Sequence, residues 1–573
     1  MQKRLGLLAC VALAVGVAAP GMAPAVAAGG AAGAALAGSV SSSEEGRMEG
    51  VIVSARRVGA TFTISVVSNA RGRYVFPRSH LDPGTYAVAI RAVGYELSAA
   101  GPVTVGARGT ATLDLALRKT GDILPQLTSV EIANSLPGDP ADVDRFVHQR
   151  LSCAYCHSYN RILKTKYTAE QWVPVINRMA SYYPDGCASS DHGRGGCHKR
   201  GNLPFLVEQS TWGLGAGNGQ TERPGIEKVE LGKFLASINL SRGQQQLAYA
   251  LKPLPRPSGR ATRVIITQYD FPRKNTVSHE ADLDAHGTLW YTDENEPYIG
   301  TLDPKTGAIT EWRIDAVPGV TEEILSLRDL TFDPDNNVWF PVRTGKGDVM
   351  TRFDVQTHET RIVPNYRSGQ FITNGDGHVW VAHGTQFVRI NPKTMEVEAK
   401  FDWSKAPNKP ADACCSYQGG IDPAGNGYMG VANYVAVLNG KTGAFRFVPI
   451  PTRWSLPRRG RVDRLGRYWF AEYLGDQLAM YDSRTDKVRE WPARKWSTPY
   501  VTSVPDRRGY VYAASNMREA VQRLDPKTGE IIEYLMPTQF DSKKIAVHPA
   551  RDHTEVWMSN KRNAQLVRLE PLD

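Results

Sequence analysis

Apolar and polar residues alternate along most of the chain. Between residues 47 and 119, segments such as VIVSARR, TFTISVVS and TYAVAIRAVG alternate with a period of two and are separated by Gly, Pro and Asn turns. This pattern predicts the short strands of a small β-sandwich. Residues 28–46 are rich in Ala, Gly and Ser, so we expect a flexible leader ahead of the sandwich.

A longer repeat occupies residues 261–573. Each unit combines a turn rich in Asp, Gly and Asn, an aromatic strand, a further strand and a closing turn of the D-P-x-T-G type. The units are anchored at Trp290, Trp339, Trp380, Met429, Trp469, Tyr512 and Trp557. Seven units spaced about 40 to 49 residues apart predict a seven-bladed β-propeller. RVIITQYDFP at 263–272 is a lone strand, which we expect to complete the last blade and close the ring.

The stretch 138–243 has the periodicity of helices instead. Asp139 ahead of Pro140 predicts one helix start, and Thr168 with Gln171 predicts a capping box at another. A last helix carries an apolar stripe at Leu231, Phe234, Leu235 and Ile238. The predicted fold class is therefore multidomain and mainly β, with a sandwich, an α-helical domain and a propeller.

The helical stretch contains a C-x-x-C-H motif at Cys153, Cys156 and His157. Two such thiols can add to the vinyl groups of haem, and the adjacent histidine can bind the iron as proximal ligand. Helix, attachment motif, helix, loop and helix resemble the order of a small c-type cytochrome. That resemblance implies one covalent haem c and a role in electron transfer. A zinc site or a thioredoxin-like site would need a different context.

The distal ligand is less defined by the sequence. Cytochromes c usually supply a methionine shortly before the closing helix, but residues 184–224 contain none. His198 lies in the corresponding loop and is the residue we favour. His192, Met179 and an open site are the alternatives.

The N-terminus indicates export. MQKR, the apolar run LGLLACVALAVGVAA and the small residues Ala25, Val26 and Ala27 form a secretory signal peptide over residues 1–27. We therefore expect a periplasmic or secreted protein. No later run of about 18 apolar residues follows, so an integral membrane protein is not expected.

The remaining cysteines occur in close pairs. An oxidising compartment favours disulfides for Cys187 with Cys197 and for Cys414 with Cys415. A widely spaced second haem attachment through Cys187 and Cys197 is the alternative for the first pair. The adjacent cysteines also resemble the pair that forms a disulfide ring over the quinone in quinoprotein alcohol dehydrogenases, although the resemblance stops at that pair. A structural disulfide is favoured there over metal binding.

The sandwich segment resembles a known accessory module. SNARGRYVF at 68–76, LDPGTY at 81–86 and VGY at 93–95 resemble the carboxypeptidase regulatory-like domain. That family implies a carbohydrate-binding-like fold. A spacer or docking role is favoured over carbohydrate binding.

The propeller repeats, such as LDAHGTLWYTDENEPYIGTLDPKTGAITEWRI, resemble the streptogramin (virginiamycin B) lyase propeller. That family implies a histidine base beside Mg²⁺ held by acidic side chains on the central face. The repeat places these residues near the starts of innermost strands: His279, Glu280, Arg328, Asp329, Gln370, Gln418, Arg459, Tyr500 and Lys543. His279 with Glu280 is the nearest pair to a base with an acid, and a structural rim histidine is the alternative.

Charge adds little to this organisation. The net charge of +10 is spread over 573 residues and suits an acidic redox partner, an anionic substrate or a plain solvated surface. Nothing resembles a nucleic-acid-binding module. We predict a periplasmic electron-transfer protein whose propeller supplies a substrate or partner site. The alternatives are a C–O lyase with an accessory haem domain and a redox-sensing binding or scaffold protein.

Overall fold

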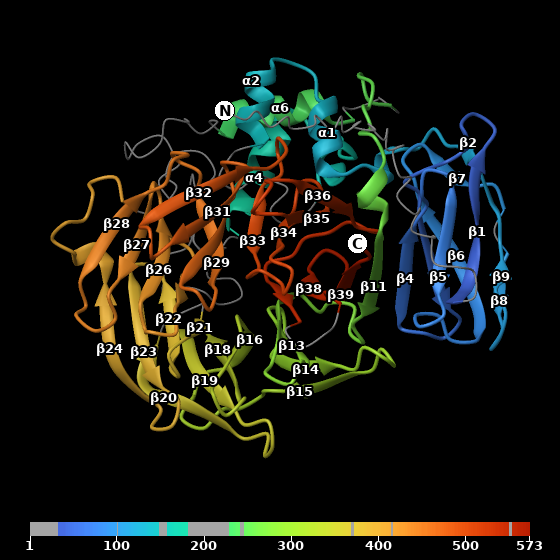
Figure 1. Cartoon of the computed structure of the whole chain (residues 1–573). Coiled ribbons are helices and arrows are strands. Elements are labelled where there is room, and N and C mark those ends of the chain that lie inside the picture. Colours follow the sequence, from blue (N-terminus) through green and yellow to red (C-terminus); the bar gives the residue numbers. More distant parts are fainter. Residues whose placement is uncertain are drawn as a thin grey trace, which may run out of the picture.

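The structure is a computed structural model of the chain. It describes residues 33–99, 101–147, 158–181, 228–240, 246–367, 372–413, 416–548 and 553–573. Figure 1 shows a sandwich beside the propeller and a group of helices on one side of the ring. Within the described ranges, no helix is both long and apolar enough to cross a membrane.

The sandwich is built from the first ten strands. They are β1 (Ala34–Ser42), β2 (Gly46–Arg47), β3 (Ile52–Arg57), β4 (Phe62–Val67), β5 (Arg73–Pro77), β6 (Gly84–Arg91), β7 (Tyr95–Leu97), β8 (Val103–Val105), β9 (Ala111–Thr112) and β10 (Leu115–Lys119). One sheet has the order β2-β1-β10-β7, with β5 and β9 also paired to β1. The other contains β4-β3-β6-β8. Apolar side chains such as Val53, Tyr74 and Phe76 fill the space between them.

The expected flexible leader over 28–46 is wrong for residues 34–46. β1 is a central strand, paired with β5 on one edge and with β9 and β10 on the other. Its small residues permit close packing: a Cβ at Gly38 would lie 1.8 Å from the carbonyl oxygen of Leu113. Ala, Gly and Ser are therefore packing residues in this strand, although the same composition is typical of a spacer.

The helical unit follows the sandwich. Its elements are η2 (Leu124–Gln126), α1 (Ser129–Ser135), α2 (Pro140–Val147), α3 (Asn160–Leu163), α4 (Ala169–Ser181) and α6 (Lys228–Ile238). Both predicted caps are confirmed. Asp139 Oδ1 accepts from the amide of Ala141 at 2.7 Å, and Thr168 and Gln171 form the reciprocal bonds of a capping box.

The first and last long helices of this unit meet through aromatic rings. The Phe146 ring on α2 lies 4.8 Å from the Phe234 ring on α6 and 5.3 Å from the Tyr159 ring. α6 also packs closely on α4, because Gly232 faces the carbonyl oxygen of Ala169, which a Cβ would approach to 2.7 Å. The helices therefore form one packed unit around a common apolar core.

The propeller comprises seven blades in the described part of the chain; six have four strands, and blade 2 has five because its innermost strand is divided in two. Blades 1 to 3 contain β12 (Ser278–Leu283), β13 (Leu289–Asp293), β14 (Tyr298–Leu302), β15 (Ile309–Arg313); β16 (Ile324–Leu327) with β17 (Thr331–Phe332), β18 (Val338–Thr344), β19 (Gly347–Phe353), β20 (Thr360–Arg367); and β21 (Ile372–Asn374), β22 (Val379–His383), β23 (Gln386–Asn391), β24 (Glu396–Asp402). Blades 4 and 5 contain β25 (Gly420–Ile421), β26 (Gly427–Val431), β27 (Tyr434–Leu438), β28 (Phe445–Pro449); and β29 (Pro457–Val462), β30 (Arg467–Glu472), β31 (Gln477–Asp482), β32 (Lys487–Pro492). Blades 6 and 7 contain β33 (Pro499–Thr502), β34 (Val511–Ser515), β35 (Ala520–Leu524), β36 (Ile531–Leu535); and β37 (Ile545–Val547), β38 (Val556–Asn560), β39 (Gln565–Pro571), β11 (Val264–Asp270). Short turns η5 (Gly259–Thr262) and η6 (Trp403–Lys405) precede β11 and follow β24.

The predicted aromatic anchors all lie on the second strand of a blade. In three blades the indole of the anchor donates to an aspartate six residues earlier: Trp290 to Asp284 at 3.1 Å, Trp339 to Asp333 at 3.0 Å and Trp469 to Asp463 at 3.0 Å. In these blades a hydrogen bond thus links the aspartate of the repeated turn to the repeated aromatic residue. β12 contacts β37 and β38, which closes the ring.

β11 belongs to two bodies. It pairs with β39 and completes blade 7, as predicted from the sequence. Its other edge pairs with β4 of the sandwich, so one sheet of eight strands runs through both bodies. Val264 and Ile266 pack in the propeller, whereas Ile265 packs in the sandwich core.

The helical unit contacts loops of blade 6. Trp496, just before β33, and Met517, between β34 and β35, pack in the helical core. The Trp496 indole donates to Asp144 of α2 at 2.9 Å, and the Val130 amide donates to the Met517 carbonyl at 2.9 Å. Loops before first strands and loops between second and third strands emerge on the same face, because successive strands alternate in direction. The helical unit therefore lies against blade 6 on the face where the innermost strands begin.

Candidate functional site

The predicted central residues are buried around the propeller axis. His279 and Glu280 lie on β12, Arg459 on β29 and Tyr500 on β33. Arg328 and Asp329 follow β16, Gln418 precedes β25 and Lys543 precedes β37. Gln370 lies outside the described residues. We call the side chains that meet at this axis the axial cluster: His279, Glu280, Asp282, Glu294, Arg328, Asp329, Gln418, Arg458, Arg459, Arg461, Lys543, Lys544 and Lys561.

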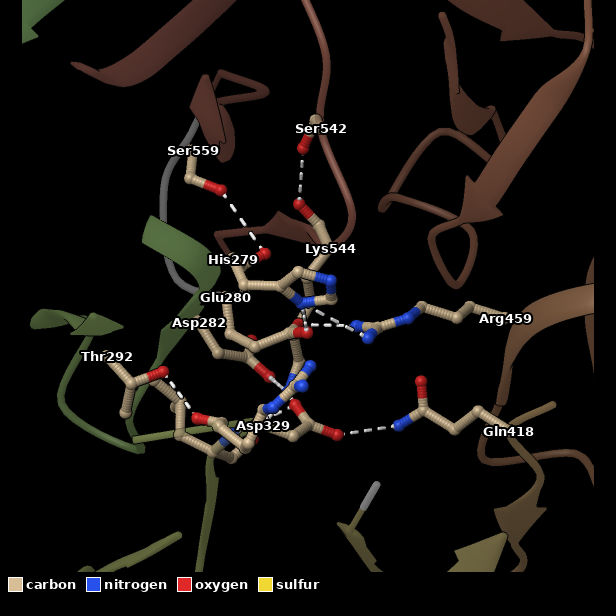
Figure 2. Close-up of polar contacts among 12 residues, drawn as sticks. His279, Glu280, Asp282, Thr292, Asp329, Gln418, Arg459, Ser542, Lys544 and Ser559 are labelled. Carbon is tan, nitrogen blue, oxygen red and sulfur yellow. Dashed lines mark hydrogen bonds and ion pairs between the residues drawn. The ribbon is translucent and has the colours of Figure 1, made fainter. Parts of the chain in front are cut away.

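His279, Glu280 and Arg459 form the centre of the axial cluster (Figure 2). His279 Nδ1 contacts Glu280 Oε1, and Arg459 Nη1 donates to Glu280 Oε2 at 2.5 Å. Arg459 Nη2 lies 3.4 Å from His279 Nδ1. Burial lowers the pKa of His279 well below its usual range, so this imidazole stays neutral at physiological pH. The predicted pair of histidine and acid is therefore present, with an arginine held against both.

Asp329 is the second junction of the cluster. Gln418 Nε2 donates to its Oδ2 at 2.9 Å, and Lys544 Nζ donates to its Oδ1 at 2.8 Å, as Figure 2 shows. Burial raises the pKa of Asp329, although Lys544 acts in the opposite direction. Asp282 lies beside it, where Arg461 donates at 2.8 Å and Lys544 Nζ is 3.3 Å away. These contacts join blades 1, 2, 4, 5 and 7 across the axis.

A third junction lies at Glu294, just after β13. Its carboxylate is 2.6 Å from Arg328 Nη1 and 2.7 Å from Lys561 Nζ. Burial acts to raise the pKa of Glu294, but Arg328 and Lys561 outweigh it and hold the pKa well below its usual range. The carboxylate is therefore charged and compensated on both sides.

Aromatic rings surround Arg458, the neighbour of Arg459. Its guanidinium lies 4.5 Å from the centre of the Tyr417 ring, 5.3 Å from Tyr473 and 5.5 Å from Tyr500. Tyr500 donates to Tyr417 at 2.7 Å. Aromatic faces attract cations, so these rings stabilise a buried positive charge near the axis.

A cavity of about 210 Å³ lies farther along the innermost strands. Its polar lining combines Arg459, Arg461 and Lys544 with Gln418 and Asn374. Asp282 is also in the lining, whereas His279 and Glu280 are not. The cavity therefore presents mainly positive and hydrogen-bonding groups, which suit a small anionic ligand.

The axial carboxylates do not fit a magnesium site. Mg²⁺ is held by carboxylate oxygens with room for several waters. Among the described residues, Glu280 is paired with Arg459, Asp329 with Lys544, and Glu294 with Arg328 and Lys561. Each of these carboxylates is already neutralised by a cationic side chain, so we derive no step that uses Mg²⁺.

The predicted haem residues lie outside the described part of the chain. They are Cys153, Cys156, His157, His192 and His198, and the pairs Cys187 with Cys197 and Cys414 with Cys415 lie there as well. Met179 falls on α4, but its side chain is not described. Haem attachment, the distal ligand and both disulfides stay predictions.

Residues 35–118 match the family model of the carboxypeptidase regulatory-like domain. This is the accessory module expected from the sequence, and its bounds agree with β1 as its first strand. No curated protein matches the chain.

Solved structures similar to this chain include two lyases. Virginiamycin B lyase from Staphylococcus aureus is 16% identical, with a TM-score of 0.45, and the match covers 54% of this chain and 99% of the lyase. A streptogramin B lyase structure is also 16% identical with a TM-score of 0.45, and covers 55% of this chain and 99% of its own.

The sequence did not point to several members of the axial cluster. Lys544 is adjacent to the predicted Lys543, and Asp282 and Arg461 lie two residues beyond Glu280 and Arg459. A period of two along the innermost strands would have found Asp282 and Arg461, because alternate residues face the same side. Other members lie on loops that only the ring closure brings to the axis: Glu294 and Lys561.

Proposed function

We propose that the protein is an exported c-type cytochrome that transfers electrons, and that its propeller binds a small anionic substrate or a redox partner. The proposal starts from the C-x-x-C-H motif in the chain that joins α2 to α3. Cys153 and Cys156 would hold haem c through thioether bonds, and His157 would bind its iron, which supplies one-electron chemistry. The signal sequence over residues 1–27 supports export to a compartment where such attachment occurs.

The position of the helical unit carries this proposal. Trp496 and Met517 fix the unit to the propeller face on which the innermost strands begin. Arg458, Tyr500 and the rest of the axial cluster lie at those strands. A redox group in the helical unit would therefore belong to the same face of the ring as the starts of the innermost strands.

The described helices offer a suitable frame for the motif. The chain leaves α2 at Val147 and returns at Ser158, and Phe146 and Tyr159 on either side pack against each other. Both ends of the motif-bearing segment are thus anchored in one apolar core. Such a core excludes water, which favours a buried cofactor.

The cavity supplies the binding step. Arg459, Arg461 and Lys544 line it with one carboxylate, Asp282, while the partners of Arg459 and Lys544, Glu280 and Asp329, lie behind the lining. We infer that the anionic group of a substrate contacts Arg461 and Lys544, with Gln418 and Asn374 as hydrogen-bonding partners. The tyrosines around Arg458 lie between this binding site and the helical unit.

Expression with export and a cytochrome maturation system tests the haem assignment. We expect one covalent haem per chain on a denaturing gel and in the pyridine haemochrome spectrum. The double variant Cys153→Ala with Cys156→Ala should stay soluble and lose both signals, whereas Cys414→Ala should keep them. Exported protein without covalent haem would overturn the proposal.

Substrate coupling is tested on the holoprotein. A panel of organic acids and their neutral amides is added, and the reduced absorption bands are followed. We expect an acid, and not its amide, to reduce the protein, with a rate at least about tenfold lower in Arg461→Ala. Equal rates in Arg461→Ala would remove the cavity from the proposed function.

The distal ligand is tested separately. His198→Ala should shift the spectrum toward high spin and permit carbon monoxide binding, whereas Met179→Ala should leave the spectrum unchanged. The reverse result would assign Met179.

A lyase is the second candidate, because His279 is neutral and held by Glu280. A neutral imidazole can act as a general base in an elimination. Such an activity would persist in the haem-free double variant and be lost in His279→Ala. Retained activity without haem would favour the lyase over electron transfer.

A further inference from the structure

A cluster of metal-binding side chains lies where the sandwich meets blade 7. His553 and Glu555 precede β38, and Glu570 lies on β39. His80 reaches them from the sandwich turn that follows β5. Neither the axial cluster nor the helical unit takes part in this site, which we call the seam site.

The geometry of the seam site suits a tetrahedral ion. One ligand atom from each of His553, Glu555 and Glu570 lies within 4.8 Å of the others. His553 Nε2 is 3.3 Å from Glu555 Oε1 and 3.4 Å from Glu570 Oε1. Two ligands of a tetrahedral Zn²⁺, each about 2.0–2.1 Å from the metal, lie about 3.3–3.4 Å apart. These separations therefore match those of a zinc site.

His80, from the other body, contacts the cluster through Glu570. Its Nε2 is 3.1 Å from Glu570 Oε2 and 3.3 Å from Glu570 Oε1. Its Nδ1 is 2.9 Å from the hydroxyl of Ser79, which fixes the ring with Nε2 toward the cluster. Outer hydrogen bonds orient the ligands of metal sites, so His80 holds the Glu570 carboxylate in place.

Neighbouring side chains also orient both carboxylates. The Trp557 indole donates to Glu555 Oε2 at 3.2 Å, so Oε1 is directed at His553. Arg568 Nε lies 3.1 Å from Glu570 Oε2, while Oε1 faces the imidazoles. Arg568 Nη1 is also 3.7 Å from Glu555 Oε1, so one guanidinium faces both carboxylates and one negative charge is left for a cation to neutralise.

We propose that His553, Glu555 and Glu570 bind one divalent transition-metal ion, with Zn²⁺ as the best match, and that His80 of the sandwich positions Glu570, so that metal binding stabilises the contact between the sandwich and blade 7. Imidazole with carboxylate is a ligand set that suits Zn²⁺ better than Ca²⁺ or Mg²⁺. The ion would strengthen the seam, because Glu570 would join it to His80 of the sandwich. Binding to the folded state alone then stabilises the seam by mass action.

Titration of the full chain with Zn²⁺ after removal of metals by a chelator tests the proposal. Calorimetry should give one more equivalent in the wild type than in His553→Ala or Glu555→Gln. Co²⁺ should produce the intense visible bands of a tetrahedral site, and these bands should be absent in the same two variants. The helical cysteines and histidines are present in every protein compared, so their contribution cancels.

The matched control is His378→Ala. His378 lies in blade 3 between Asp376 and Glu398, 3.2 Å from each, but its two ring nitrogens face different carboxylates. It should keep the wild-type stoichiometry. His80→Ala should weaken Zn²⁺ binding at least about tenfold and abolish the Zn²⁺-dependent rise in Tm of the transition in which the sandwich and blade 7 unfold together.

Two results would overturn the proposal. The first is an equal number of equivalents in the wild type and in His553→Ala. The second is stability of the seam that depends on pH but not on Zn²⁺ or chelator, which would make the cluster an ion-pair network only.

Discussion

The sandwich and the helical unit are attached to the propeller in different ways. The sandwich shares a continuous sheet with blade 7, in which β4 and β11 exchange backbone hydrogen bonds over five residue pairs. The helical unit is held chiefly by side chains, with Trp496 and Met517 inserted in its core. The shared sheet fixes the orientation of the sandwich along a whole strand, whereas the side-chain contacts fix the helical unit at one place only. We therefore expect the sandwich to unfold with blade 7 and the helices to detach by themselves.

Ile265→Asp should have the largest effect, because it breaks the shared sheet. Ile265 is 1% exposed and packs in the sandwich core from a propeller strand. An unpaired carboxylate there should cost about 4–5 kcal/mol or more. Hydrogen exchange should rise in both β4 and β39, and Val58→Asp, on a side chain that is 71% exposed, is the control. Increased exchange in β4 alone would contradict the joint unfolding of the two bodies.

Trp496→Ala should release the helical unit alone. Loss of a buried indole and its bond to Asp144 should cost about 3–5 kcal/mol. Exchange should rise in α1 and α2 and stay low in β13. Trp454→Ala is the matched control, because Trp454 occupies the corresponding loop of blade 5 and its amide is also held by a side-chain oxygen, that of Asn433. Joint unfolding of helices and propeller would make the two attachments equivalent.

Arg91→Met should have an intermediate effect that depends on pH. From the end of β6, Arg91 donates to the carbonyl of Gln126 and to Glu519 at 3.0 Å, so it links all three bodies. Its removal should cost about 2–3 kcal/mol, as for a hydrogen bond to a charged group.

The pH dependence follows from Glu519. Burial raises its pKa, and Arg91 and Arg562 act in the opposite direction. The unfolded carboxyl ionises first as pH rises, so stability falls between the unfolded and the folded pKa. Without Arg91 the folded pKa rises further, so the deficit should be smallest near pH 5 and largest near pH 8. Thermal melts at both values check this, and a constant deficit would contradict it.

Thr128→Ala should have the smallest effect. Thr128 and Glu131 form the capping box of α1, beside the bond from Val130 to Met517. Loss of this cap should cost about 1 kcal/mol and raise exchange in α1 only. Thr168→Ala removes the cap of α4 and should leave α1 unchanged. An effect of Thr128→Ala on the propeller would show that the interface between the helices and blade 6 transmits local unfolding.

The sequence predicted the repeated elements best, because the same pattern of residues occurs in several blades. The anchors at Trp290 and Trp469 and the closing strand at 263–272 follow from spacing alone. β1 escaped prediction because Gly38 and its small neighbours serve close strand packing, which has the same composition as a linker.

The candidate sites were predictable only in part, because closure brings together residues that are distant in sequence. His279 and Glu280 are adjacent and were found together, but the contact of Glu280 with Arg459 spans 179 residues. The seam site is more distant still, since His80 and Glu570 are 490 residues apart. No local pattern contains such a pairing, and only the shared sheet brings the two side chains together.

β11 also has a consequence for the order of synthesis. The strand is made early. Gln565 of blade 7, which donates to Asp270 of β11, follows 295 residues later. Domains fold from the N-terminus as the chain emerges, so the sandwich is complete while the blades are still being made. β4 then offers β11 a partner throughout that interval and masks one edge of a strand that would otherwise aggregate. We therefore expect the sandwich to hold the first strand of the ring in place until the last one is made.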